Sequence, residues 1–244
     1  MDMLENTFTL RVAECDLRGA WRPGAILTEL QEAAGLHSAA LGCGREALLG
    51  VGAAWVVSRL ALQMDRYPLY GEKITVRTFH GPARHSLFPR YFVLLDGASQ
   101  VIGKASSLWL LMDLQSRRSL SGDALPVPLP DNGGLSAPLP LPGNIPSVAA
   151  AETVFSRVPV YTDLDPNLHV NNARYVDWLC NALGVETMTA YQLRTLTVHY
   201  NSEILADQPV ELRLRQTEDL VHLLGMRGKT PAFEIGGTLV PIPR

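Results

Sequence analysis

Residues 58–78 read SRLALQMDRYPLYGEKITVRT, and residues 194–214 read RTLTVHYNSEILADQPVELRL. The two stretches align without a gap at a constant offset of 136 residues. In both, apolar and polar residues alternate, a turn follows, and the alternation resumes. A period of two is typical of a half-buried β-strand, so each stretch predicts a strand, a turn and a second strand. The chain therefore contains an internal repeat.

One helical pattern precedes each of these stretches. The first covers 23–41, with Pro23 suited to the first helical position. The second covers 171–184, with Asn171 or Asn172 as the expected N-cap and Gly184 at the C-terminal end. Alternating segments follow each strand pair, so each copy predicts a first strand, one long helix and about four antiparallel strands.

Residues 123–150 are rich in proline and show no periodicity, which predicts an extended linker. This segment separates a first half, 1–122, from a second half, 151–244. A curved sheet wrapped around each helix would bury that helix, and pairing the halves would cover an exposed sheet edge. The expected fold is therefore α+β, with two antiparallel sheets, each around a long central helix, joined in one chain as a pseudo-dimer.

Composition narrows the class of protein. The 244 residues carry a net charge of −3 and no basic block, so we expect no nucleic-acid partner. Apolar runs are too short to span a bilayer, and the N-terminus has no apolar signal region, so we expect no membrane insertion. Cys15, Cys43 and Cys180 lack the spacing of a disulfide framework or a zinc site. These features predict a cytoplasmic protein that needs no metal or organic cofactor.

Three polar residues, Asp165, Asn167 and His169, lie just before the second helical pattern. When the copies are aligned through the Asp-Leu pairs at 16–17 and 163–164, the first copy has none of the three. A folding role should be needed in both copies, so a functional role is the better interpretation. The alternative is a surface turn, which Asp and Asn commonly form.

The position of this triplet suits acyl transfer. The backbone N–H groups of Val170, Asn171 and Asn172 would lie at the start of the helix, where free donors can stabilise an oxyanion. Glu203 has Tyr67 as its counterpart at the repeat offset, and its carboxylate could activate water. We therefore expect a single catalytic site, in the second half.

The segment that contains these residues resembles the corresponding segment of the acyl-acyl carrier protein thioesterases of plant plastids and bacteria. Members of that family carry a D-x-N-x-H-V-N-N segment, followed by Lys or Arg, Tyr and a Trp-containing helix, and residues 165–178 match it. Further matches lie at 30–37, 55–79 and 105–120. The resemblance implies a tandem hotdog fold and hydrolysis of fatty acyl chains from acyl carrier protein, with the acyl chain held largely in the first half.

The resemblance also implies roles for residues. Asp165, Asn167, His169 and Glu203 would form the catalytic set, with Glu203 taking a proton from water, assisted by His169. Asn167 would position the thioester or the water, and Asp165 would orient His169 or Asn167. The family's Y-R-R-E-C segment reads YNSEI at 200–204 here, so its cysteine is replaced by Ile204 and both arginines are absent. A thiol nucleophile at that position is therefore excluded.

The acyl tail is expected between the helix and the sheet of the first half, where apolar side chains alternate with small ones. The predicted tail-binding residues are Ile26, Leu30, Ala33, Ala34 and Trp55.

Other functions were weighed against this one. R-specific enoyl-CoA hydratases share the hotdog fold, but their histidine lies five residues after the aspartate, and here it lies four after. Acyl-CoA hydrolysis and non-catalytic acyl binding stay open, although a binding module would not need the Glu203 and His169 pair. Arg117 and Arg118 are predicted to lie in a solvated turn, and His37 in the core. Acyl-chain length and a homo-oligomer are left open.

Overall fold

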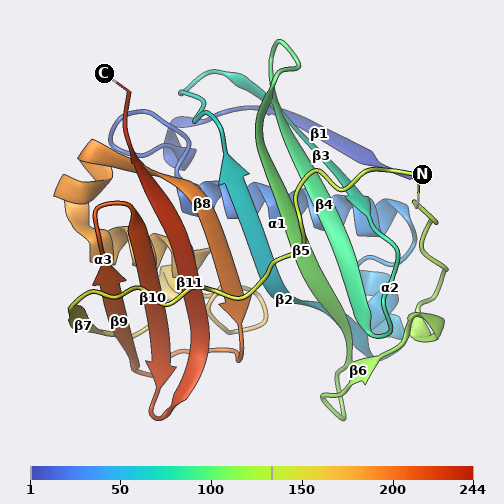
Figure 1. Cartoon of the computed structure of the whole chain (residues 1–244). Helices are drawn as coiled ribbons and strands as arrows, with labels where there is room; N and C mark the ends of the chain where they lie inside the picture. Colours follow the sequence, from blue (N-terminus) through green and yellow to red (C-terminus); the bar gives the residue numbers. More distant parts are fainter. Residues whose placement is uncertain (1, 133, 244) are drawn as a thin grey trace.

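In the computed structural model, which describes residues 2–132 and 134–243, the chain forms an 11-stranded antiparallel sheet (Figure 1). The first half contributes β1 (Leu4–Thr9), β2 (Ala53–Met64), β3 (Lys73–His80), β4 (Leu87–Asp96), β5 (Val101–Asp113) and the short β6 (Ser119–Leu120). The second half contributes β7 (Glu152–Arg157), β8 (Tyr191–Tyr200), β9 (Val210–Gln216), β10 (Leu220–Arg227) and β11 (Thr230–Pro241). Across the sheet the order of ten strands is β1-β3-β4-β5-β2-β8-β11-β10-β9-β7, and the short β6 pairs with β5 outside this order.

Strands β2 and β8 join the two halves in antiparallel pairing. Ala61 lies opposite Thr197, and these two residues are separated by the same 136 positions as the two copies of the repeat. Each copy therefore meets its own counterpart at this point, as in a two-fold symmetric dimer interface. The predicted repeat of strand, turn and strand and the antiparallel α+β architecture are confirmed.

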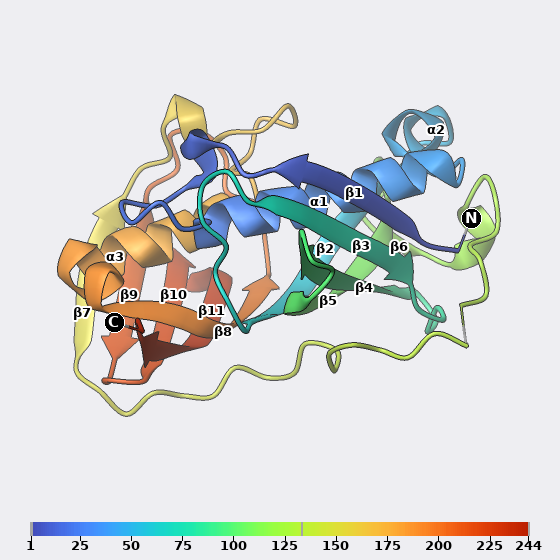
Figure 2. The same ribbon diagram turned by 90° about the horizontal axis from the view of Figure 1, so that it is seen from above.

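The two long helices, α1 (Pro23–Ala40) and α3 (Arg174–Ala190), lie on the same face of the sheet (Figure 2). Pro23 occupies the start of α1 as predicted, because its fixed φ angle suits the first helical turn. A single apolar cluster continues across the seam and includes Leu30 of α1, Val176 of α3 and strand residues of both halves. The core is thus shared by the two copies.

One predicted boundary of the second helix was wrong. The helix begins at Arg174, because the Asn171 side chain accepts the N–H of Ala173 at 2.9 Å and holds a turn ahead of the helix. Gly184, with φ of 83°, ends the regular helix as predicted, and a second helical segment follows it as far as Ala190. The sequence did not predict α2 (Arg45–Gly50), which is too short to show a helical period. Three short 3-10 turns complete the secondary structure: Val12–Glu14, Gly122–Ala124 and Tyr161–Asp163.

The proline-rich segment crosses the face of the sheet opposite the helices (Figures 1 and 2). Ser106 Oγ donates to the carbonyl of Pro140 at 2.6 Å, and His199 Nε2 lies 2.8 Å from the carbonyl of Gly143. Asn132 Nδ2 donates to the carbonyl of His80 at 3.0 Å. Polar contacts therefore hold this segment against both halves. In the described part of the chain, no helix has the length and apolar character needed to cross a membrane.

Candidate active site

The loop before α3 and the loop before α1 have the same backbone plan. An isolated bridge pairs Leu164 with Val170 in the second half and Cys15 with Trp21 in the first. These bridges set the two loops at an offset of 149 residues, whereas the shared Asp-Leu letters had suggested 147. The alignment based on those letters was therefore wrong by two residues.

The corrected alignment makes Asp16 the counterpart of Asp165. Asp16 Oδ1 accepts the N–H of Arg18 at 2.8 Å, and Asp165 Oδ1 accepts the N–H of Asn167 at 2.8 Å. The carboxylate thus holds the same turn in both copies. The expectation that the first copy lacks an equivalent of Asp165 was wrong.

The copies differ at three other positions. Asn167 corresponds to Arg18, His169 to Ala20 and Glu203 to Tyr67. The turn also differs at Leu168, whose φ is 66° where the first copy has Gly19 at 77°. A leucine in this left-handed conformation costs about 1–2 kcal/mol. Strain of this kind is common at functional loops.

His169 and Glu203 form the centre of the site. His169 Nε2 lies 3.5 Å from Glu203 Oε2, and His169 Nδ1 lies 3.8 Å from Asp165 Oδ1. The loop is fixed to the segment after β8, because Val170 N–H donates to the carbonyl of Ile204 at 2.8 Å. Both His169 and Glu203 are partly exposed, so solvent and substrate can reach them.

Two arginines of the first half reach across the seam into this site. Arg117 Nη2 donates to Glu203 Oε2 at 2.8 Å, and Arg45 Nη2 donates to Asn167 Oδ1 at 3.3 Å. Arg117 lies in an exposed turn as predicted, with its side chain 56% exposed, and the same side chain also pairs with Glu203. The site is therefore built from both halves, although its histidine and glutamate belong to the second.

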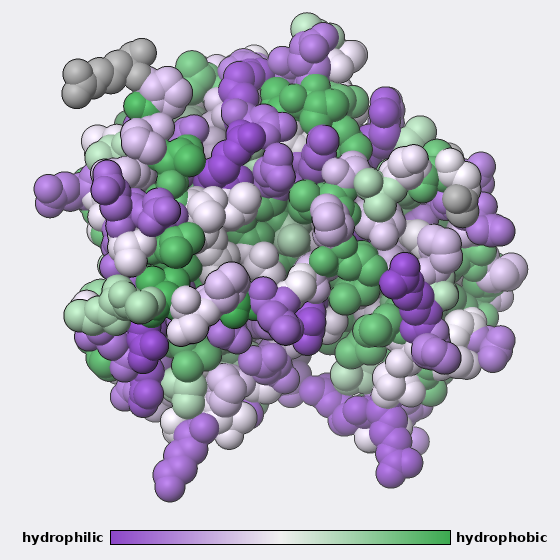
Figure 3. All heavy atoms as spheres, viewed as in Figure 1, coloured by the Kyte–Doolittle hydropathy of each residue, from purple (hydrophilic) through white to green (hydrophobic). Residues whose placement is uncertain are grey.

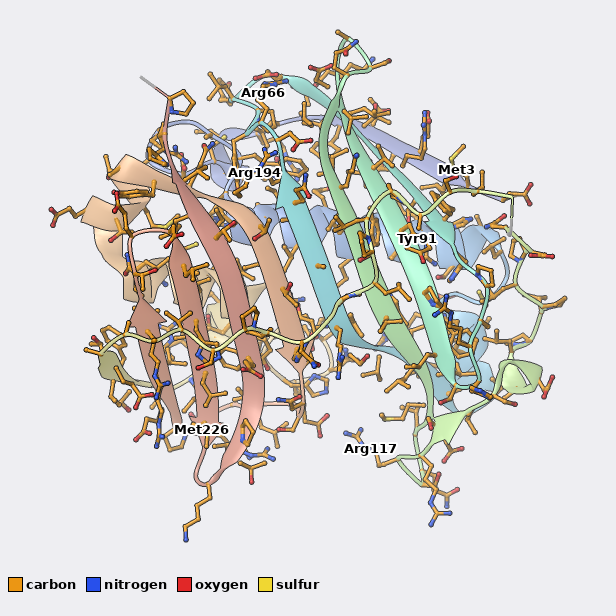
Figure 4. All side chains as sticks on the ribbon, viewed as in Figure 1. Met3, Arg66, Tyr91, Arg117, Arg194 and Met226 are labelled. Carbon is orange, nitrogen blue, oxygen red and sulfur yellow. The ribbon has the colours of Figure 1, made fainter. Side chains whose placement is uncertain are left out.

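The site opens at one edge of the molecule. Arg117 and Met226 lie at the same end of the sheet, on opposite halves (Figure 4). Between them the molecular surface is hollowed (Figure 3). Glu203 is held from both sides of this hollow, since Arg227 Nη1 donates to its backbone carbonyl at 3.0 Å.

Two of the three predicted oxyanion donors are not free. Val170 N–H binds the carbonyl of Ile204, and Asn171 N–H donates to the carbonyl of Asp163 at 2.9 Å. The prediction was wrong for these two residues, because tertiary contacts occupy their donors. For Asn172 N–H, no acceptor is found within the described residues. Of the three predicted donors, the N–H of Asn172 is therefore the one that the described residues leave without an acceptor.

A small cavity lies between α1, the sheet and the start of α3. Its volume is about 20 Å³, which is room for about one water molecule. It is lined by Leu27, Leu30, Gln31, Val57, Leu60, Phe92, Ser107, Trp109, Asn172, Ala173 and Tyr200. The lining joins the loop that carries His169 to the apolar space of the first half. An acyl tail in this space would have to displace side chains.

The predicted tail-binding residues take different places. Leu30 lines the cavity, whereas Ile26, Ala33 and Ala34 are buried in the main apolar cluster. Trp55 packs edge-on against Phe88 in a second, smaller cluster. Leu30 is therefore the one predicted tail-binding residue, of five, that lines the cavity.

Two tyrosines lie beside the site, the buried Tyr175 and the partly buried Tyr200. Burial raises the pKa of Tyr200 far above its ordinary value, and burial followed by the charge of Asp165 does the same for Tyr175. Both side chains are therefore neutral at physiological pH. Tyr200 donates a hydrogen bond to the carbonyl of Asn172 at 3.4 Å, and Tyr175 stacks on Phe233 with ring centroids 4.4 Å apart.

Sequence models of the N-terminal and C-terminal domains of acyl-ACP thioesterases match residues 2–121 and 149–230. The chain belongs to the acyl-ACP thioesterase family. The chloroplastic oleoyl-acyl carrier protein thioesterase of Coriandrum sativum is 26% identical over 221 residues. That alignment includes 84% of this chain but 60% of the plant protein, so the chain spans less than two thirds of that relative.

Solved structures of acyl-ACP thioesterases share the fold. The protein from Bacteroides thetaiotaomicron superimposes with a TM-score of 0.83 at 23% identity, covering 98% of each chain. The 12:0-ACP thioesterase of Umbellularia californica gives a TM-score of 0.79 at 20% identity, again covering 98% of each chain. The expected tandem hotdog fold is thus confirmed.

Within this thioesterase-family chain the cysteines are poorly placed to react. Burial raises the pKa of the Cys180 thiol to about 12, and it also raises the pKa values of Cys15 and Cys43. The thiolate is the reactive form of cysteine, so all three are weak nucleophiles at neutral pH.

Proposed function

We propose that this chain hydrolyses fatty acyl-acyl carrier protein to a free fatty acid and the carrier protein. Membership of the acyl-ACP thioesterase family supports this proposal. The observation that carries it is the His169–Glu203 pair, 3.5 Å apart. Asn172, three residues after His169, lines a small cavity whose other walls include residues of the first half. An imidazole and a carboxylate at this separation can share the proton of an attacking water.

In the proposed reaction Glu203 removes a proton from water while the water oxygen forms a bond to the thioester carbonyl carbon. The carbon–sulfur bond then breaks. The sulfur leaves as a thiol after taking a proton from the Glu203 carboxylic acid, which restores the carboxylate. His169 donates or accepts a hydrogen bond with Glu203 and keeps it directed at the water.

The carbonyl oxygen carries negative charge between these two steps. Asn172 N–H is one donor for it, and the Asn167 side-chain amide is the other. Arg45 occupies Asn167 Oδ1, and Asp165 Oδ2 accepts one N–H of the amide at 3.5 Å, which leaves the second N–H of the NH₂ group for the substrate. Asp165 fixes the turn that carries Asn167 and His169.

The same proposal assigns the halves. Residues 151–244 carry the catalytic histidine and glutamate, residues 1–122 hold the acyl tail, and residues 123–150 connect them. Arg45, Arg117 and Arg227 surround the mouth with positive charge in a chain of net charge −3, which suits the phosphate-bearing arm of a carrier protein. A cytoplasmic location belongs to this proposal, and the three free cysteines support it.

The test is release of free fatty acid from acyl carrier protein loaded with saturated chains of increasing length. Matching acyl-CoA esters are assayed in parallel, with Glu203→Gln as the inactive control. Hydrolysis of the carrier-protein esters, lost in the control, is expected. Equal or faster turnover of the CoA esters would favour an acyl-CoA thioesterase, and binding without turnover would indicate a non-catalytic acyl-binding protein.

A further inference from the structure

A row of polar side chains crosses the inner, helix-facing side of the first half's sheet. The strand register places Ser107 of β5 beside Arg90 of β4, and Arg90 beside His80 of β3. On the other side, Leu60 of β2 lies beside Ser107. We name as the polar row Ser107, Arg90 and His80, together with His37 and Ser38 of α1 above them.

Arg90 is 1% exposed and is hydrogen-bonded to two histidines and a serine. Its Nη1 donates to His37 Nδ1 at 3.1 Å, and its Nη2 donates to Ser38 Oγ at 3.0 Å and to His80 Nε2. Among the described residues, no carboxylate contacts it. Burial lowers the pKa of Arg90 to about 9, which leaves it charged at neutral pH. A buried cation without a counter-charge is destabilising, so its presence in a core calls for a reason.

The cavity that Asn172 lines is in line with this row. Leu60 and Ser107 both line the cavity, and the next position in the row is Arg90. Two strand spacings, roughly 10 Å, separate Leu60 from Arg90. Phe88 and Phe92 lie two residues to either side of Arg90 on the same strand, and both are 1% exposed. The straight path from the cavity is therefore closed by the guanidinium, with a large ring on each side of it.

We propose that Arg90 sets the upper limit of the acyl-chain length that this site accepts. This inference rests on the proposed hydrolysis of acyl thioesters. A chain that enters past Asn172 and runs along the row has apolar neighbours as far as Ser107, and then its methyl end meets a charged group. Arg90 cannot swing aside, because both of its terminal nitrogens are bonded to α1 and to β3.

The decisive variants are Arg90→Met and Arg90→Lys. Methionine has a similar length without charge, so it should open the row. We expect kcat/KM for the next longer even chain, relative to the best chain of the wild type, to rise about tenfold or more, since each added methylene in an apolar pocket is worth that much. Lysine keeps the charge, so Arg90→Lys should keep the wild-type dependence of kcat/KM on acyl-chain length. The wild-type dependence in folded Arg90→Met protein would refute the inference.

A second measurement uses the wild-type protein, in case Arg90→Met does not fold. Fatty acids with a diazirine at the methyl end are bound, photolysed and mapped by peptide mass spectrometry. Labelling should stop at Leu30, Leu60 or Ser107 whatever the chain length. Labelling of His80, or faster hydrolysis of chains ending in a hydroxyl or carboxyl group, would show that the row receives the chain end instead of blocking it. Failure to hydrolyse any acyl-carrier-protein ester would refute the proposed function, whereas the labelling pattern would still report the position of the block.

Discussion

Replacing Glu203 by Gln removes the proposed base while keeping the shape of the side chain. The substitution removes the ion pair with Arg117 and changes the contact with His169; the side chains of Arg117, His169 and Glu203 are 56%, 29% and 38% exposed. Ion pairs this exposed contribute about 1 kcal/mol or less to stability. The backbone contact between Arg227 and the Glu203 carbonyl does not involve the side chain and should persist. We therefore expect the free energy of unfolding to fall by no more than about 1 kcal/mol.

The effect on catalysis should be much larger. Losing a general base lowers the rate about 10²–10⁴-fold, which corresponds to roughly 3–5 kcal/mol of activation free energy. A loss of this size in kcat, with at most a small loss of stability, separates a chemical role of Glu203 from a structural one. The assay is fatty acid release from acyl carrier protein, with urea unfolding of the same preparations.

Glu234→Gln is a matched control. Glu234 lies on β11 of the same half and is paired with His222 at 2.7 Å, so it has the same chemistry away from the site. This variant should keep the wild-type kcat. A Glu203→Gln protein with more than about a tenth of the wild-type kcat would refute the assignment, because a lost base leaves at most about a hundredth.

Three further predictions concern the surroundings of Glu203. Arg117→Gln should lower kcat while changing stability by about 1 kcal/mol or less, and Arg117→Lys should restore part of the rate; equal kcat in all three proteins would show that the arginine does not position Glu203. Asp165→Asn and Asp16→Asn should destabilise the protein to a similar extent, since both hold the same turn, but only Asp165→Asn should reduce turnover; urea unfolding and the release assay compare them. A variant with all cysteines changed to Ala or Ser should keep most of its activity. In the folded wild type, alkylation of Cys180 should stay slow at pH 8 and accelerate only as the pH approaches about 12, because the thiolate forms near that value. Rapid alkylation with loss of activity at pH 7 would contradict water as the nucleophile.

The repeat was readable from the sequence because its strands keep one register in both copies. A constant offset of 136 aligned the two copies, and the same offset separates Ala61 from Thr197, which lie opposite each other at the seam. The loops before the helices were misaligned, because the alignment relied on the identical Asp-Leu pairs at 16–17 and 163–164, whereas the backbone bridges of the two loops correspond at a different offset. The hydrogen bonds of Asp16 and Asp165 show the true correspondence, and no residue pattern reveals them.

The site was only partly predictable for a similar reason. The family motif brought together His169, Asn167 and Glu203, but the arginines that contact them lie 86 and 122 residues away in sequence. Such contacts depend on how two surface turns project across the seam, which local patterns do not encode. The donors of Val170 and Asn171 were predicted to be free from their place before a helix, yet tertiary pairing uses both. Whether a backbone donor is free can be judged only from the folded chain.

The β2–β8 seam has a consequence for how the protein responds to dilution and to mutation. In a dimer of two separate chains, the Arg117–Glu203 contact would exist only while the chains stay together, so it would be lost at low concentration. Here the two side chains belong to one chain, which keeps their effective concentration at about the millimolar level whatever the amount of protein. A substitution in a homodimer also appears twice, once in each subunit. In this chain the position of Glu203 and that of Tyr67 can change separately, so the two halves can diverge in sequence while they keep the same fold.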